Sequence, residues 1–283
     1  MTVIITGANS GIGKETAKAL AKLGWRVVMV CRNPQKGEVA RQEIIKYSGN
    51  SNIDLLIADL SSLSDIKHLG DKLKSRYGSI DVLINNAGGA YFKRQLSKDG
   101  HEMTFAVNYL AVYYLTMLTL PLLKAAPKGR IVIVSSMLHA FGKIDWNDIE
   151  FKNRKYNLLT AYSQSKLMTI IFTKELAKRL EGTNVTVNAL HPGGVATTLG
   201  MNDNPLIYKL VWKLVSLFSI SAKKGAETSI YLASSPDVAG ISGQYWSHKK
   251  QRKSNPRADK AGVGERLWEF SERSVESGSK VRA

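Results

Sequence analysis

Short apolar runs alternate along the chain with longer segments whose apolar residues recur at helical spacing. Runs of this length, rich in Val, Ile and Leu, are typical of strands buried in a parallel sheet. The predicted strands are Thr2–Thr6, Arg26–Val30, Ile53–Ile57, Ile80–Ile84, Gly129–Val134, Val185–Leu190 and a short last strand at Gly243–Trp246. The predicted helices follow Gly13 and cover Glu38–Tyr47, Ile66–Tyr77, Ala161–Leu180 and Ala222–Ser234, with a final short helix near Leu267–Phe270.

This alternation predicts an α/β fold, a doubly wound Rossmann-type parallel sheet with helices on both faces. A chain of 283 residues could form one large α/β domain or two small ones, and we find no second-domain boundary. We therefore expect a single domain over residues 1–283, with a basic, solvated C-terminal extension from about His248. Ligands of such sheets bind outside the carboxyl ends of the strands.

One uncharged stretch, Met103–Leu123, is long enough to cross a bilayer. It contains Asn108 and several Thr and lies between strand–helix units, so we expect a buried core or dimer-interface helix. The chain reaches its first strand by Val3 with no basic leader, so no signal peptide is predicted. The single cysteine, Cys31, allows no internal disulfide and no cysteine-rich metal site, which fits a reducing compartment.

A glycine-rich turn, Gly7-Ala8-Asn9-Ser10-Gly11-Ile12-Gly13, joins the first strand to the first helix. Glycines at such a turn let backbone N–H groups approach a pyrophosphate at the positive end of the helix. A lone turn of this kind is weak evidence, and a flexible loop is the alternative. Strand, turn and helix nevertheless stand in the required order, which favours a nucleotide site.

The end of the second strand bears on the choice of nucleotide. Enzymes that use NAD place a carboxylate there to hold the ribose hydroxyls, but this chain has Cys31-Arg32-Asn33 and no acid. A carboxylate would repel a 2′-phosphate, whereas a guanidinium can bind it with two hydrogen bonds. The sequence therefore predicts NADP(H), with Arg32 on the 2′-phosphate. The alternative is an Arg32 that is merely exposed at a strand end.

Tyr162 and Lys166 are the candidates for proton transfer. Their spacing places both on one face of a helix, about one turn apart. An ammonium beside a phenol favours the phenolate, so we expect the pKa of Tyr162 to fall. Taken alone, the spacing also fits a surface tyrosine beside a solvated lysine.

Further motifs follow other predicted strands: Asn85-Asn86-Ala87-Gly88, Ser135-Ser136 and His191-Pro192-Gly193. Together with the glycine turn and the Tyr–Lys pair, they resemble the short-chain dehydrogenase/reductase family over nearly the whole chain. The long stretch between Ser136 and Tyr162 and the sequence Cys31-Arg32-Asn33-Pro34 resemble its retinol dehydrogenase branch. The resemblance implies that the stretch after Ser136 lines the substrate side. His139 is close enough in sequence to touch substrate, but we expect a surface loop histidine.

The resemblance implies four catalytic residues. Tyr162 would transfer the proton, Lys166 would lower its pKa and hold the nicotinamide ribose, and Ser136 would donate a hydrogen bond to the carbonyl oxygen. Asn108 would hold a water that relays protons toward Lys166, with a hydrogen bond between helices as the alternative. No metal site is expected.

The resemblance also implies the residues that contact the cofactor. They are Gly7, Asn9, Ser10, Gly11, Ile12, Gly13, Arg32, Asp59, Leu60, Asn86, Ala87, Gly88, Tyr162, Lys166, Pro192, Gly193, Val195 and Thr197. Asp59 could instead begin the turn before Ser61. Ser10 stands where the family has a second basic residue, so the preference for NADP(H) could be modest.

Two segments bear on partners. Residues 198–221 resemble the family's substrate lid, and within it Leu206–Phe218 combines a broad apolar face with a narrow polar stripe, which also fits shallow membrane contact. Apolar helices around Tyr113 and Ile170–Phe172 resemble those that pair in family dimers. Exposing them would leave a large apolar patch, so we expect a homodimer.

The net charge of +17 could indicate binding to nucleic acid, to an anionic membrane surface or to an anionic cofactor. No zinc-finger spacing or aromatic RNA-binding pattern occurs, so no specific nucleic-acid partner is expected. The expected function is NADP(H)-dependent interconversion of a small hydrophobic alcohol and its aldehyde or ketone, in the cytoplasm and at most peripheral to a membrane. The alternative is a non-catalytic NADP-binding sensor or scaffold. The physiological substrate and direction stay open.

Overall fold

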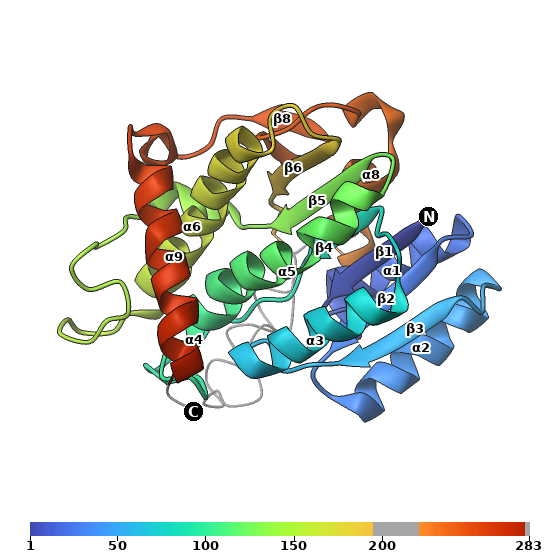
Figure 1. Ribbon diagram of the computed structural model, residues 1–283, viewed down its shortest axis with the longest axis horizontal. Helices are drawn as coiled ribbons and strands as arrows, with labels where there is room; N and C mark the ends of the chain where they lie inside the picture. Colours follow the sequence, from blue (N-terminus) through green and yellow to red (C-terminus); the bar gives the residue numbers. More distant parts are fainter. Residues whose placement is uncertain (195–220, 281–283) are drawn as a thin grey trace.

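The computed structural model describes residues 1–194 and 221–280. One eight-stranded sheet crosses this part of the chain in the order β3-β2-β1-β4-β5-β6-β7-β8 (Figure 1). All described strands are parallel to their neighbours except β8, which is antiparallel to β7. This order, with the chain leaving β1 in one direction and returning through β4 in the other, confirms the predicted doubly wound Rossmann-type fold.

The strand bounds follow the predicted pattern closely. They are β1 Thr2–Thr6, β2 Arg26–Cys31, β3 Ile53–Ile57, β4 Val82–Asn85, β5 Gly129–Val134, β6 Val185–Leu190, β7 Tyr245–Ser247 and β8 Lys250–Arg252. Strand β4 begins two residues later than predicted, because the Ile80 N–H bonds to the carbonyl of Leu122 outside the sheet.

Helices cover both faces of the sheet (Figure 1). Their bounds are α1 Gly11–Lys22, α2 Pro34–Ser48, α3 Leu63–Arg76, α4 Met103–Phe105, α5 Ala111–Ala125, α6 Leu158–Arg179, α8 Ala222–Ser234 and α9 Val263–Lys280. One apolar cluster packs α1, α2 and α8 against the sheet, and a second packs α3, α5, α6 and α9 against the opposite face. Helix α6 begins three residues before its predicted start because the Asn157 side chain caps it at the Thr160 N–H.

The uncharged stretch is a core helix. Among the described residues, Met103–Ala125 is long and apolar enough to cross a membrane, but its most apolar window is 67% buried within the chain. It is built from α4, a π-helical turn over Ala106–Leu110, and α5. The burial agrees with the predicted core helix.

The final helix changes the picture of the dimer face. We expected a short helix near Leu267–Phe270, but α9 is 18 residues long and lies along α6 (Figure 1). The Trp268 ring packs edge-on against Tyr113 at 5.3 Å and lies 6.0 Å from Phe172. The apolar faces of α5 and α6 are therefore covered by the chain itself. The exposed patch that motivated the homodimer prediction is absent from this face, while the oligomeric state itself stays a prediction.

We expected the basic segment from His248 to be a solvated extension, but its backbone joins the sheet. His248 and Lys249 turn the chain with positive φ, and Lys250–Arg252 then pairs with β7 as the edge strand β8. The side chains of β8 are exposed, while its backbone bonds to the sheet. Its basic composition is that of an edge strand, where charged side chains discourage pairing with other chains.

Candidate active site

The candidate residues converge at the carboxyl ends of β1, β4, β5 and β6, where the topology predicts a ligand. The glycine turn leaves β1, the Asn85–Gly88 turn leaves β4, and Ser135 and Ser136 leave β5. The Thr6 hydroxyl accepts hydrogen bonds from the N–H groups of Asn86 and Ala87, at 2.9 Å each. These bonds tie the first two turns together across the sheet.

The glycine turn is shaped by two glycines. Gly7 has φ +67°, which favours glycine, and its N–H bonds to the Val30 carbonyl at 2.8 Å. A Cβ on Gly13 would lie 2.4 Å from the Gly7 carbonyl oxygen, so only glycine fits there. The turn therefore packs tightly against the start of α1.

The start of α1 is suited to an anion. Its N-cap residue, Ser10, makes no side-chain capping bond, and the first turn carries no acidic residue. N–H groups of an uncapped first turn carry partial positive charge and bind phosphate readily. The residues of this turn therefore fit the pyrophosphate of a dinucleotide.

The two residues expected at the adenosine end differ in their contacts. Arg32 is exposed after β2 and forms no ion pair within the described part of the chain. The Asp59 carboxylate accepts hydrogen bonds from the Ser61 N–H at 3.0 Å and hydroxyl at 2.8 Å. This is the turn-forming role that we kept as the alternative for Asp59, and its contact with adenine stays a prediction.

Tyr162 and Lys166 lie together on α6 beside the end of β5. Lys166 is buried; its Nζ donates to the Val134 carbonyl at 3.0 Å and lies 5.7 Å from the centre of the Tyr162 ring. The Tyr162 hydroxyl shares a hydrogen bond with the Ser136 side chain. The neighbouring Ser135 hydroxyl instead donates to the Lys166 carbonyl at 2.9 Å, so Ser136 is the serine that faces Tyr162.

The expected fall in the pKa of Tyr162 is wrong for the protein alone. Burial raises the pKa of Tyr162, and the hydrogen bond with Ser136 offsets only part of that rise. Burial also lowers the pKa of Lys166 to about 8, since a buried ammonium loses its hydration. The same desolvation thus disfavours both charged forms. At neutral pH the phenol is protonated and can act as a proton donor.

Asn108 is fully engaged by the protein. Its Oδ1 accepts from the Gly89 N–H at 2.7 Å, and its Nδ2 donates to the Gly89 carbonyl at 2.9 Å and to the Ser165 hydroxyl at 3.1 Å. These bonds hold the turn after β4 against α6. They favour the alternative role for Asn108, a structural hydrogen bond between elements in place of a bond to a relay water. Asn108 lies in the π-helical turn, a distortion frequent at functional sites. The water relay stays a proposal.

The turn after β6 is only partly described. The His191 Nδ1 accepts from the Gly193 N–H at 3.0 Å, and burial lowers the pKa of His191 to about 4. A neutral histidine that closes the turn matches the expected structural role. Val195, Thr197 and the lid at 198–221, apart from its last residue, lie outside the described residues.

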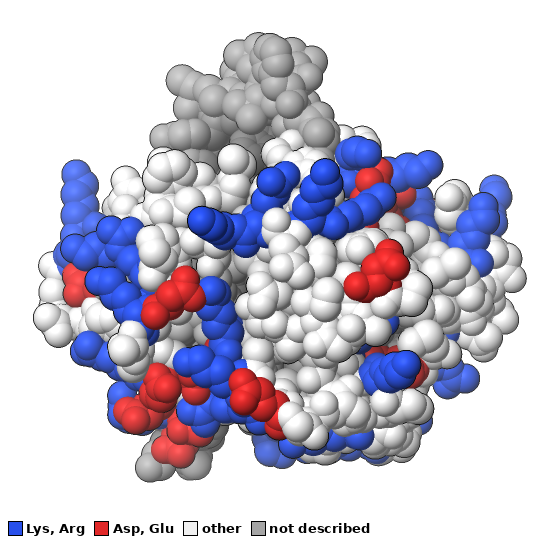
Figure 2. Space-filling view, turned by 90° about the horizontal axis from the view of Figure 1, so that it is seen from above, with Lys and Arg blue, Asp and Glu red and all other residues white. Residues whose placement is uncertain are grey.

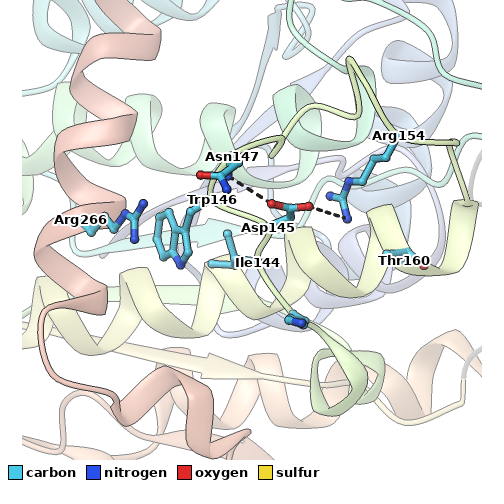
Figure 3. A pocket seen from close by; sticks show the side chains of 8 residues that line it. Ile144, Asp145, Trp146, Asn147, Arg154, Thr160 and Arg266 are labelled. Atoms are coloured by element: carbon cyan, nitrogen blue, oxygen red, sulfur yellow. Dashed lines mark hydrogen bonds and ion pairs between the residues drawn. The ribbon is translucent and has the colours of Figure 1, made fainter.

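Part of the stretch after Ser136 lies away from Tyr162, and whether the rest lines the substrate side stays a prediction. Lys143–Asn147 line a separate pocket of about 470 Å³ with Arg154, Thr160 and Arg266 (Figure 3). The Arg266 guanidinium lies 4.5 Å from the centre of the Trp146 ring, and Arg154 pairs with Asp145 at 3.8 Å. This pocket contains none of the expected catalytic residues.

Comparisons with known proteins decide the family. Residues 1–206 match the family described as short chain dehydrogenase. The chain belongs to this family. It is 44% identical to mouse retinol dehydrogenase 14, over 96% of this chain and 84% of that protein. It is 40% identical to human retinol dehydrogenase 13, over 97% of this chain and 84% of that protein.

Solved structures agree with the fold. An uncharacterized protein of Mycobacterium paratuberculosis is 33% identical, covers 97% of this chain and 93% of its own, and superposes with a TM-score of 0.79. Salutaridine reductase of Papaver somniferum, 23% identical over 87% of this chain and 99% of its own, has a TM-score of 0.66. This short-chain dehydrogenase is thus retinol-dehydrogenase-like. It is an oxidoreductase that acts on CH–OH groups and binds a nicotinamide cofactor.

Proposed function

We propose that this short-chain dehydrogenase uses NADP(H) to interconvert a hydrophobic alcohol and its aldehyde or ketone. The observation that carries the proposal is the hydrogen-bonded pair of Tyr162 and Ser136 beside the buried Lys166, at the strand ends next to an anion-binding turn. Bound NADPH would supply the hydride. The residues of this chain would bind the substrate oxygen and move its proton.

Each catalytic side chain has a distinct task in this proposal. In reduction, the Tyr162 hydroxyl donates its proton to the oxygen on which charge develops, and in oxidation its phenolate accepts the proton of the alcohol. The Ser136 hydroxyl donates a hydrogen bond to the same oxygen. The Lys166 ammonium holds the nicotinamide ribose hydroxyls and favours the phenolate once cofactor is bound.

The test of catalysis is a spectrophotometric assay with Tyr162→Phe. Purified protein is mixed with NADPH and a panel of aldehydes that includes retinal and small carbonyl compounds, and the loss of NADPH absorbance is followed. Tyr162→Phe is expected to abolish turnover and keep NADPH binding. Tyr77→Phe is the matched control, because the Tyr77 hydroxyl bonds to Asp54 away from the site. Retained turnover in Tyr162→Phe would refute the acid–base assignment.

The choice of retinal and other apolar carbonyls rests on the relatives. The names of the mouse and human relatives say that they act on retinol. A hydrophobic substrate is therefore the proposal for this chain, and the panel ranks apolar against small polar carbonyls. Tight NADPH binding without turnover of any carbonyl would favour a cofactor-binding sensor instead.

The preference for NADP(H) rests on Arg32. The residues at the end of β2, Cys31-Arg32-Asn33, include no acid, and the exposed Arg32 is free of ion pairs within the described residues. We expect a higher kcat/KM with NADPH than with NADH, and Arg32→Ala should raise the KM for NADPH alone. Lys46→Ala, at the far end of α2, controls for loss of a surface charge. A clear preference of the wild type for NADH would contradict the proposal.

Peripheral membrane contact and a homodimer are finer proposals. Blue side chains spread over much of the face in Figure 2, with fewer red ones between them. On β8, Lys250 and Arg252 are exposed, and a basic surface attracts anionic lipid. Flotation with anionic and with neutral vesicles tests the contact, and a chain that binds neither has none. Light scattering after size-exclusion chromatography tests the homodimer, which needs a surface other than the one under α9.

A further inference from the structure

His139 does not lie on the surface loop where we expected it. It is 3% exposed, one turn beyond Ser136 in a 3-10 helix over Met137–Phe141. Its ring packs edge-on against Tyr245 of β7 at 4.5 Å. A buried polar side chain is costly unless both ring nitrogens find partners, so the partners of His139 are informative.

Both ring nitrogens of His139 have partners, and these define its proton. Nδ1 lies 2.7 Å from the Ser136 carbonyl oxygen, which can only accept. Nε2 lies 3.3 Å from the backbone nitrogen of Asn255, which donates its N–H. The ring is therefore neutral, with its proton on Nδ1 and donated to Ser136. Burial also lowers the pKa of His139, in agreement with the neutral form.

The Asn255 side chain forms hydrogen bonds with the rest of the same turn. Its side-chain nitrogen donates toward the carbonyls of His139 at 3.0 Å, Ala140 at 3.0 Å and Gly142 at 3.1 Å. Its Oδ1 accepts from the Arg257 N–H at 2.9 Å, which orients the amide. Asn255 is 3% exposed, so these bonds are shielded from water.

The other side of the turn is closed by α6. A Cβ on Gly142 would lie 2.5 Å from the Ser163 carbonyl oxygen and 2.7 Å from the Leu167 Cβ. Ser136 begins the turn in extended conformation, and its hydroxyl accepts from the Leu138 N–H at 3.2 Å. The turn is thus held between α6 and the segment after β8, and Ser136 is the residue where it meets Tyr162.

We propose that Asn255 and His139 are positioning residues for Ser136, which hold its hydroxyl where it can serve both Tyr162 and the substrate oxygen. The inference rests on the proposed function and deepens it. Asn255 comes from the segment after β8, beyond residues 1–206 that match the family. The C-terminal part of the chain therefore contributes to the geometry of a site whose reacting groups all precede it.

The test compares Asn255→Asp and Asn255→Ala with matched changes at Asn50. Asn50 has the same chemistry: its amide donates to the carbonyls of Ala21 and Trp25, and its Oδ1 accepts from the Asn52 N–H. It lies beside the amino ends of β2 and β3, at the edge of the sheet opposite to the site. Asn255→Asp replaces the donor by a carboxylate that faces three carbonyls, and Asn255→Ala removes it. Kinetics, NADPH affinity and hydrogen exchange over residues 135–143 are measured on the full-length protein.

We expect both Asn255 variants to lose about ten- to hundred-fold in kcat with unchanged NADPH affinity, because a misplacement of about 1 Å at a site can cost about a hundredfold. Exchange over residues 135–143 should speed up in these variants alone. Wild-type kcat in folded Asn255 variants, or an equal loss in the Asn50 variants, overturns the inference. A wild type without turnover on any carbonyl instead refutes the proposed function, and the positioning role fails with it.

The histidine supplies an independent readout. Ring ¹⁵N NMR should show His139 neutral with Nδ1 protonated between about pH 5 and 8. Tyr245 faces the ring directly, and His191 stacks on the Tyr245 ring at 5.9 Å, with His248 beyond it. In Asn255→Asp the His139 signal should move, whereas in Asn50→Asp it should not. An Nε2-protonated ring in the wild type would contradict the hydrogen bonding on which the inference depends.

Discussion

The two halves of α6 bury their side chains for different reasons. The first half buries polar groups that have specific partners: Gln164 donates to the Ile149 carbonyl at 2.8 Å, and Lys166 to the Val134 carbonyl at 3.0 Å. The second half buries Ile170, Phe172 and Leu176 under α9. A buried polar group must find its partner, whereas an apolar face accepts any apolar cover. We therefore expect changes at the buried polar groups of the first half to act on catalysis, and changes at the apolar face of the second half to act on stability.

The largest effect that would sharpen this comparison is on catalysis. Lys166→Met should lower kcat by about a hundred- to ten-thousand-fold, the range for loss of a group that supports proton transfer. It should not lower the thermal stability of the cofactor-free protein, because burial already disfavours the ammonium. Activity assays and thermal unfolding measure both. Near-normal kcat in this variant would show that the first half is no different from the second.

Changes in the second half of α6 should lower stability and leave catalysis unchanged. Phe172 is 2% exposed and packs against Tyr113 and Trp268, so Phe172→Ala should lower the free energy of unfolding by about 3–5 kcal/mol. The kcat of the folded fraction should not change. Denaturant unfolding and active-site titration measure the two. Phe141→Ala is the control, because Phe141 is 78% exposed and should cost almost nothing. An equal effect of both changes would contradict the burial of this face.

A pH dependence should set Lys166 apart from every apolar position of α6. The pKa of Lys166 is lowered to about 8 in the folded protein, so the unfolded chain binds the extra proton above that pH. The free-energy cost of burying the Lys166 ammonium is therefore complete below about pH 8. It disappears as the pH rises to about 10.5, so the free energy of unfolding rises by up to about 3 kcal/mol. The difference in unfolding free energy between wild type and Lys166→Met should follow this curve. A difference independent of pH would show that Lys166 is not desolvated.

The smallest effect concerns how α9 is held at its far end. His101 bonds through Nδ1 to Glu150 at 3.2 Å and through Nε2 to the Ser274 carbonyl of α9 at 3.1 Å. Burial alone would lower the pKa of His101, but Glu150 and the Ser274 carbonyl raise it more. The stabilisation is therefore complete at acid pH and is lost as the pH rises through this raised pKa.

His101→Gln should cost about 1 kcal/mol at acid pH and less at alkaline pH, since one charged hydrogen-bonded contact is removed. Unfolding at several pH values, with exchange of the α9 amides, measures it. His68→Gln is the control, because His68 is exposed on α3. A constant difference across pH would mean that His101 does not hold α9 as the charged form.

Much of the fold could be predicted from local pattern. Apolar runs gave the strands and their parallel order, because a strand buried on both faces has little choice of composition. The candidate residues of the site were also predictable, since Tyr162, Lys166 and the glycine turn keep a fixed spacing within single elements. The starts of β4 and α6 were less so, because a single hydrogen bond set each of them: the Ile80 N–H donates to the Leu122 carbonyl, and the Asn157 side chain accepts from the Thr160 N–H.

Other features depend on contacts between residues far apart in the chain. The basic composition after His248 suggested solvent, yet the backbone there completes the sheet while only the side chains meet water. The loop position of His139 suggested exposure, but Asn255, 116 residues later, buries it. The apolar faces of α5 and α6 suggested a second subunit, and α9 covers them instead.

The sequence by itself determined the family, the order of strands and helices and the candidates for the reacting groups, because these depend on residue type and local spacing. Only the tertiary structure decided the protonation of the site and the occupant of the apolar face. The pKa of Tyr162 and of Lys166 depends on how much water the whole fold excludes. The spacing of four residues between them does not predict that exclusion. An apolar surface likewise does not specify which apolar segment covers it.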